Sequence, residues 1–288
     1  MSRHHNTFLK THGFTCLAGL FLLLVIKFYY SRADSDGLLW ILAPTAWWVR
    51  TLSGISFAYL PHIGYVNHDF RFVIAASCSG VQFWIIAASL LLFAFLPRIH
   101  TQKRGLIWLV TGFLCSYAFT ILVNGFRILL SLYLPLYLSN AGMFQSESGW
   151  LSPKRLHTVI GVFVYFGSLL FLFFITESWF SKSGCDACPP YPASDSFTHS
   201  PMDCRAFSAI RPDKCFLSIS ELMLYHLRWL LPALWYLAVV LGLPLLNRAY
   251  QRDPLAFREY TLTILLVCFP MLLLFRLLQK LLSPGKHS

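Results

Sequence analysis

Cys78 is the first candidate in this chain for a catalytic side chain. Cys78 lies in the stretch Ser77–Gly80, directly before a long apolar run, so we expect it at the N-terminal end of a helix. The positive end of the helix dipole favours a thiolate at such a position. The alternative interpretation is packing, because cysteine also behaves as a small apolar residue between helices.

Two further side chains complete a candidate site. Arg127 separates two strongly apolar stretches, where a charge is costly to bury and is functional unless it snorkels to the interface. The position reads as a helix end, so snorkelling is the alternative. Asn124 lies three residues earlier on the same helical face and is expected to orient the guanidinium. His157 opens another apolar run, with Gly161 on its face, and suits an interfacial histidine as well as a catalyst.

Together these groups are sufficient for thiol-based acyl transfer. The imidazole of His157 takes the thiol proton, the Cys78 thiolate attacks a carbonyl, and the Arg127 guanidinium stabilises the oxyanion. Gly80 leaves room for a substrate backbone, and Asn124 is the second candidate substrate-binding residue. This chemistry needs neither a metal nor a cofactor, and we predict none.

The composition indicates that these residues are positioned by membrane-spanning helices. Apolar residues make up 57% of the 288 residues and charged residues 12%, with a mean hydropathy of +0.60. Soluble domains carry about 25% charged residues. The apolar residues form blocks near 13–30, 80–96, 105–123, 157–177, 222–246 and 260–279. We therefore predict an all-α, polytopic membrane protein with about 6–8 transmembrane or interfacial helices.

Three other segments are harder to assign. Residues 38–60 are apolar but contain Pro44 and Arg50, so they could span the bilayer or lie in its interface. Residues 128–138 are too short to cross as a straight helix. Polar and apolar residues alternate in 64–75, which predicts a strand or hairpin that leads into the Cys78 helix.

Basic residues predict the orientation of the helices. They crowd the loop 97–104, which should be cytoplasmic, as should the N-terminus. The loop and the N-terminus can both be cytoplasmic only if residues 38–60 do not fully cross the membrane. If 128–138 then lies flat or re-enters, Cys78, Arg127 and His157 reach the outer face together. The C-terminal end of the first helix, around Tyr30, reads as an interfacial anchor.

The net charge of +11 does not indicate nucleic-acid binding. The basic residues lie mainly in short connections and form no basic face. Such a distribution orients helices and attracts anionic lipid head groups. We therefore expect membrane lipids as partners and exclude nucleic acid.

A polar insert divides the chain into three parts. Residues 181–218 are rich in Pro, Ser and Asp and separate a membrane core (1–180) from a two-helix appendage (219–288). The insert contains four cysteines, which could bind zinc in the cytoplasm, form two disulfides in the periplasm, or remain unpaired. Our topology places the insert in the cytoplasm. These cysteines are Cys185, Cys188, Cys204 and Cys215.

Three short motifs give the core a resemblance to a known family. The motifs 75–80 around Cys78, 124–128 around Arg127, and His157 followed by Gly161 resemble the exosortase/archaeosortase membrane transpeptidases. The stretches 41–48 and 64–69 resemble the exosortase K branch. The resemblance covers residues 10–180.

The resemblance implies a cysteine enzyme of the bacterial inner membrane with its site on the periplasmic face. Such an enzyme cleaves the C-terminal sorting signal (PEP-CTERM-like) of exported proteins, which consists of a short motif, a transmembrane helix and a basic cluster. Cys78 would be the nucleophile, His157 the base and Arg127 the electrostatic partner. The rival interpretations are a non-enzymatic membrane transport or assembly protein, and a membrane acyl or lipid transferase with His157 as base.

Overall fold

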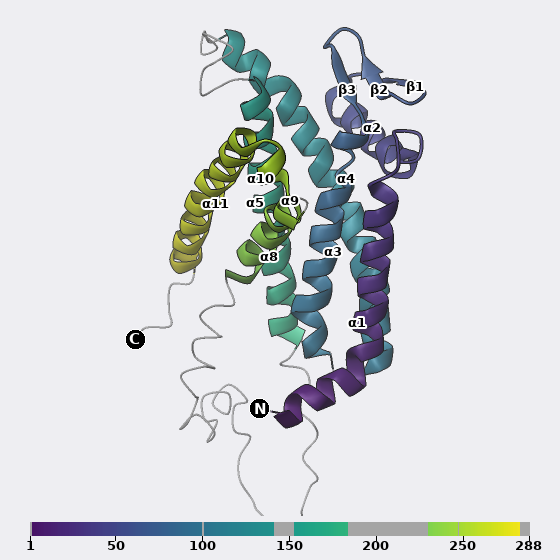
Figure 1. Cartoon of the computed structure of the whole chain (residues 1–288), viewed down its shortest axis with the longest axis vertical. Helices are drawn as coiled ribbons and strands as arrows, with labels where there is room; N and C mark the ends of the chain where they lie inside the picture. The colour runs from purple at the N-terminus through teal and green to yellow at the C-terminus, as the bar shows by residue number, and fades with distance from the viewer. Residues whose placement is uncertain (1, 100, 141–152, 184–229, 247, 283–288) are drawn as a thin grey trace, which may run out of the picture. The chain divides into compact units, whose positions relative to one another are not determined.

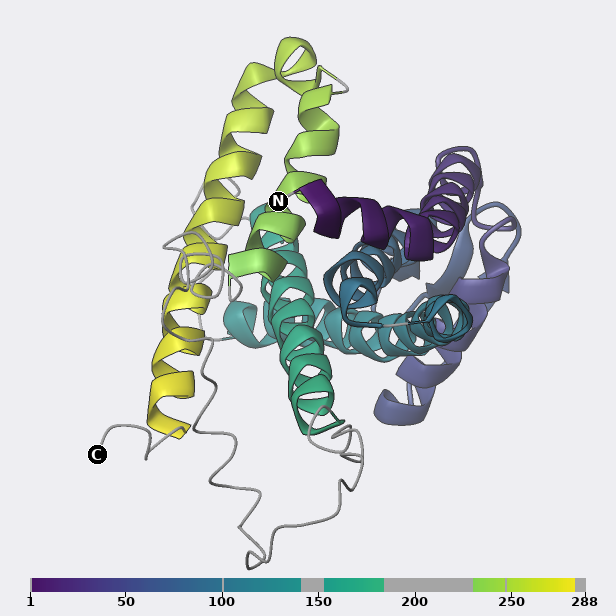
Figure 2. The same cartoon turned by 90° about the horizontal axis from the view of Figure 1, so that it is seen from below.

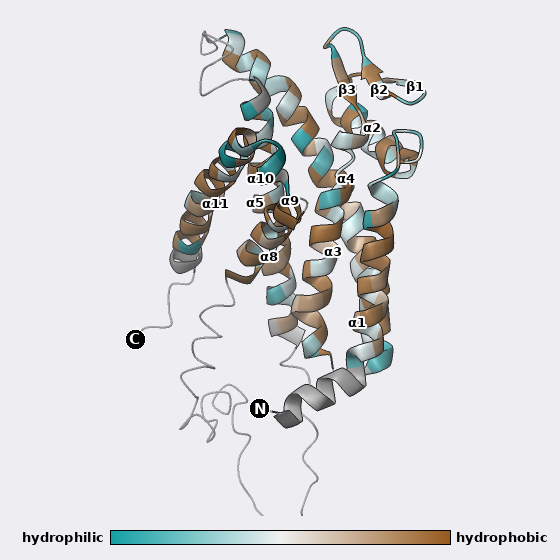
Figure 3. Ribbon diagram, viewed as in Figure 1, coloured by the Kyte–Doolittle hydropathy of each residue, from teal (hydrophilic) through white to brown (hydrophobic). Residues whose placement is uncertain are grey.

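The computed structural model describes residues 2–99, 101–140, 153–183, 230–246 and 248–282 (Figure 1). Within these residues it is mostly helical, and five helices are long and apolar enough to cross a membrane. The hydropathy of these helices is visible in Figure 3. The chain is accordingly a multi-pass membrane protein, and the predicted fold class is confirmed. The five candidate spans are His12–Tyr30, Ala76–Arg98, Gln102–Asn140, Arg155–Phe180 and Pro254–Leu278.

The ambiguous segment 38–60 does not cross as one helix. After α1 (Ser2–Tyr30), helix α2 runs from Leu39 to Ser53, only 15 residues. It ends at Gly54, which adopts the left-handed conformation that glycine accepts without strain. Such a helix is about 22 Å long, shorter than the hydrocarbon core of about 30 Å.

The alternating segment before Cys78 forms a small antiparallel sheet. Its strands are β1 (Ala58–Leu60), β2 (Gly64–Asn67) and β3 (Phe72–Ile74), in the order β1-β2-β3. Tyr65 pairs with Ile74, so the predicted hairpin is present and a third strand precedes it. A short 3₁₀ turn, η1 (Ala76–Cys78), follows β3 and leads to α3 (Val81–Phe95) and a second 3₁₀ turn, η2 (Leu96–Arg98).

Helix α4 (Gln102–Asn140) corrects the predicted topology. It is one helix of 39 residues, so the separation of 105–123 from 128–138 was wrong. At about 58 Å it extends well beyond the hydrocarbon core. Asn124 and Arg127, which were expected at the end of the predicted helix 105–123, lie within α4, and their side chains are buried.

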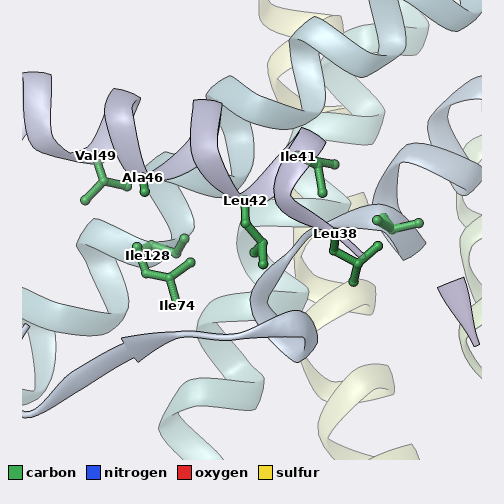
Figure 4. Packing of buried hydrophobic residues seen from close by; sticks show 8 residues of the cluster. Leu38, Ile41, Leu42, Ala46, Val49, Ile74 and Ile128 are labelled. Carbon is green, nitrogen blue, oxygen red and sulfur yellow. The ribbon is translucent and has the colours of Figure 1, made fainter. Parts of the chain in front are cut away.

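An apolar cluster fixes the turn that carries Cys78. Helix α2 packs on α4, and α1 and α3 also contact α4. Cys78 packs against a set of buried residues drawn from α2 and the residue before it, β3, α3 and α4. Figure 4 shows how the labelled members of this set lie together. Burial of each large member contributes about 1.5–3 kcal/mol. The cluster comprises Leu38, Ile41, Leu42, Ala46, Val49, Ile74, Val81 and Ile128.

The remaining helices are α5 (Pro153–Ser183), α8 (Leu231–Val240), α9 (Gly242–Leu246), α10 (Ala249–Arg252) and α11 (Pro254–Leu282). Of the predicted helix 222–246, the described part is interrupted at Leu241. Almost all of the insert 181–218, including its four cysteines, lies outside the described residues.

Backbone contacts divide the chain into two units, residues 1–173 with 232–288, and residues 174–231. The C-terminal helices therefore pack with the core. Trp235 of α8 donates a hydrogen bond to Ser89 Oγ of α3 at 2.8 Å. Next to it, the ring of Tyr236 contacts Phe166 of α5 with centroids 5.2 Å apart.

Candidate functional site

Cys78 is the last residue of η1 and lies just before helix α3. Its backbone N–H donates to Ala75 O at 2.8 Å, and its side chain is partly buried. Gly80 has a φ of 76°, a left-handed conformation that turns the chain into α3 at Val81. The prediction that Cys78 lies near the N-terminus of a helix is therefore confirmed.

Asn124 of α4 connects this turn to α5. Its side chain is fully buried, with 0% exposed. Its Nδ2 donates to Cys78 O at 2.7 Å, and its Oδ1 accepts from the Tyr165 hydroxyl at 2.7 Å. Both polar atoms are thus engaged with Cys78 and Tyr165, whereas the sequence suggested that Asn124 orients Arg127. The amide acts as a positioning group for the cysteine turn.

Gly80 makes this arrangement possible. A Cβ on Gly80 would lie 3.0 Å from Cγ of Asn124. Since real Cβ atoms rarely approach so closely, any other residue would press on the amide. The room that Gly80 leaves is therefore occupied by Asn124, and the role of these two residues in substrate binding stays a prediction.

Arg127 lies inside the protein rather than at its surface. Its side chain is 6% exposed, which excludes the snorkelling alternative. The guanidinium lies over the Tyr165 ring, 5.3 Å from its centroid. The Arg127 Nη1 atom faces Gly161 of α5, since a Cβ added to Gly161 would lie 3.9 Å from this atom.

The guanidinium of Arg127 is short of partners. Its Nε and Nη2 are sealed from solvent, and neither forms a hydrogen bond among the described residues. The ionisable groups around it are the Tyr165 phenol, the Cys78 thiol and the Tyr30 phenol. An unpaired buried charge is costly, by several kcal/mol.

His157 is the fifth residue of α5, on the face that continues through Gly161 and Tyr165. It interacts electrostatically with Arg127. Among the described interactions, none joins His157 directly to Cys78. The structure therefore brings Arg127 to Cys78, and Arg127 and His157 line one cavity.

A cavity of 160 Å³ adjoins Arg127 and His157. Its walls come from α3, α4, α5, α8 and α11, and most of its lining side chains are apolar or aromatic. They are Gln82, Phe83, Ile86, Arg127, His157, Thr158, Gly161, Val162, Tyr165, Tyr236, Val240 and Tyr260. No local pattern in the sequence indicated that the C-terminal helices contribute to this site.

Tyr30 also belongs to the site, although the sequence did not indicate this. Read as a membrane anchor, it instead packs on the same apolar cluster as Cys78. Its phenol interacts with Ser79, Cys78 and Arg127. A tyrosine at the end of an apolar helix looks the same in sequence whether its hydroxyl meets lipid head groups or a neighbouring turn.

A charged cluster lies on the loops beside this site. The imidazole of His62 lies 3.2 Å from an Asp34 oxygen and 3.0 Å from an Asp36 oxygen. The hydrogen bond with Asp34 raises the pKa of His62. The Gly37 N–H lowers the pKa of Asp34. These three ligand groups lie within 4.8 Å of one another, close enough for a metal ion, but they are paired among themselves and we assign them none.

This cluster is connected to the cysteine turn. The Asp36 carboxylate accepts a hydrogen bond from Tyr59, which lowers the pKa of Asp36 and raises that of Tyr59 to about 12. Ser35, between the two aspartates, donates to Ile63 O at 2.9 Å and accepts from Ala76 N at 3.2 Å. The loop after α1 therefore holds both the β1–β2 turn and the first residue of η1.

Comparison with protein-family models, with curated proteins and with solved structures gives no match. What the site does must therefore be argued from its own geometry. The features that bear on it are the cysteine turn, the buried guanidinium and the adjoining cavity.

Proposed function

We propose that this chain is a membrane cysteine protease or transpeptidase that cleaves the C-terminal sorting signal of exported proteins. The observation that carries the proposal is the buried Arg127 guanidinium beside Cys78, two nitrogens of which have no hydrogen-bond partner among the described residues. A thiolate at Cys78 supplies the missing negative charge. The same cation then stabilises the oxyanion that forms when the thiolate attacks a carbonyl.

The proposed reaction has two stages. His157 accepts the thiol proton, through a water molecule or after a side-chain rotation, since no direct hydrogen bond joins it to Cys78. The thiolate sulfur bonds to the carbonyl carbon, the peptide C–N bond breaks, and the amine leaves with the proton from His157. Water or an amine of an acceptor then attacks the thioester and releases Cys78.

The depth of the site in the membrane supports a substrate that is itself membrane-anchored. From Gln102 to Asn124, α4 rises about 33 Å, close to the hydrocarbon thickness of about 30 Å. Cys78 is thus near one membrane boundary, and the basic loop 97–104 is near the other. By the positive-inside rule the site faces outward, which in a bacterial inner membrane is the periplasm. A substrate helix can approach laterally through the bilayer.

The proposal is tested by C-terminal processing of a co-expressed protein that carries a sorting tail. We expect Cys78→Ala to abolish processing, and Arg127→Met and His157→Ala to reduce it at least about 100-fold. The matched control is Cys115→Ala, which removes an exposed cysteine of α4. Normal processing by Cys78→Ala at unchanged protein levels would refute the enzyme.

The orientation is tested separately. A membrane-impermeant maleimide added outside intact spheroplasts should label Cys78. Labelling that appears only after the membrane is broken would place the site in the cytoplasm. That result would leave the thiol chemistry possible but exclude exported substrates.

A further inference from the structure

The cavity beside Arg127 and His157 has a wall that the core alone does not supply. Three of its lining residues belong to the C-terminal helices, Tyr236 and Val240 in α8 and Tyr260 in α11. The opposite wall includes Phe83 and Ile86 of α3. Without α8 and α11 this side of the cavity would be open.

The contacts of α8 with the core are specific enough to define a wall. The Trp235 indole N–H donates to Ser89 Oγ at 2.8 Å, and its ring contacts Phe93 with centroids 5.7 Å apart. On the other side of α8, Tyr236 is 3% exposed and packs against Phe166. Helix α8 is thus held on both α3 and α5, with Tyr236 and Val240 facing the cavity.

The size and lining of the cavity indicate what it can hold. A dry cavity of about 150 Å³ accommodates a molecule of the size of benzene, and this one measures 160 Å³. Apolar and aromatic side chains form most of its surface, and Arg127 and His157 also line it. It therefore suits one apolar side chain, and Arg127, which interacts with Cys78, connects it to the cysteine turn.

We propose that α8 and α11 complete a specificity pocket for one apolar substrate side chain, about the size of leucine, next to the carbonyl that Cys78 attacks. This inference rests on the proposed function. It assigns the C-terminal helices to substrate selection, with Val240 as the residue that limits the size of the side chain.

The test uses peptidyl chloromethyl ketones with glycine, leucine or tryptophan next to the ketone. The Cys78 sulfur attacks the methylene carbon, a C–S bond forms, and the C–Cl bond breaks as chloride leaves. The full-length protein in membrane vesicles is treated with each reagent, and modification of Cys78 is followed by mass spectrometry. Because the leucine side chain is buried in the pocket, we expect it to label about tenfold faster than glycine, and tryptophan to label slowly.

Two substitutions at one position report on the wall. Val240→Phe fills the pocket, so the leucine reagent should label no faster than the glycine reagent. Val240→Ala enlarges the pocket, so tryptophan should label faster. The matched control is Leu234→Phe, at a side chain on the same helix that is 53% exposed and should leave all three rates unchanged.

The outcomes separate the inference from the proposed function. Labelling of Cys78 at rates that do not depend on side-chain size, or that are the same in both Val240 variants, overturns the pocket and leaves the cysteine enzyme intact. Failure of all three reagents to label Cys78, while a small maleimide still does, counts against both.

Discussion

The hydrogen bonds of Asn124 make the most quantitative prediction. Asn124→Leu keeps the shape of the side chain but removes the bonds to Cys78 O and from the Tyr165 hydroxyl. Each buried bond contributes about 0.5–1.5 kcal/mol net, although hydrogen bonds in membrane proteins average nearer 0.6 kcal/mol. The variant should therefore lose about 1–3 kcal/mol of unfolding free energy.

A double-mutant cycle isolates one of the two bonds. Tyr165→Phe removes only the hydroxyl and should cost about 0.5–1.5 kcal/mol by itself. When Asn124 is already Leu, the hydroxyl has lost its acceptor, so its removal should cost nothing or stabilise slightly. We expect the two substitutions to be coupled by about 0.6–1.5 kcal/mol.

The assay is reversible unfolding of the full-length protein in mixed micelles, followed by the fluorescence of its 9 tryptophans. Thr111→Val is the control, because the hydroxyl of Thr111 bonds only within its own helix, α4, and is exposed. Effects of Asn124→Leu and Tyr165→Phe that add to within about 0.3 kcal/mol would refute the idea that this bond joins α4 to α5.

Three further predictions concern single positions. Gly80→Ala should destabilise the protein by about 1 kcal/mol more than Gly54→Ala, since both glycines have a φ above 70° but only the former contacts a neighbouring carboxamide; equal losses would contradict this contact. Arg127→Met should slow maleimide labelling of Cys78 at neutral pH about tenfold, because it removes the cation that interacts with the thiol. Unaltered labelling would remove the guanidinium from the mechanism. The raised pKa of His62 means that its ion pairs stabilise the hairpin fully below pH about 6.5 and are lost as the pH rises through that raised value. Protection of the hairpin amides from hydrogen exchange, corrected for the intrinsic rate, should therefore fall as the pH rises above about 6.5, and the fall should be absent in His62→Ala.

The sequence by itself determined the membrane class, the extended segment and the position of Cys78. Long apolar blocks can only be satisfied by a bilayer or an apolar core, and alternation in 64–75 fits a sheet. These features are local, since each depends on residues near one another in the chain.

Only the tertiary structure decided how α4 runs and what surrounds Arg127. Hydropathy suggested a break around Asn124 and Arg127, because polar residues inside a membrane helix are costly. That cost depends on partners from other helices, which here are the turn at Cys78 and Tyr165 of α5. Partners so distant in sequence leave no local pattern. The contribution of α8 and α11 to the cavity wall could not be predicted from the sequence for the same reason.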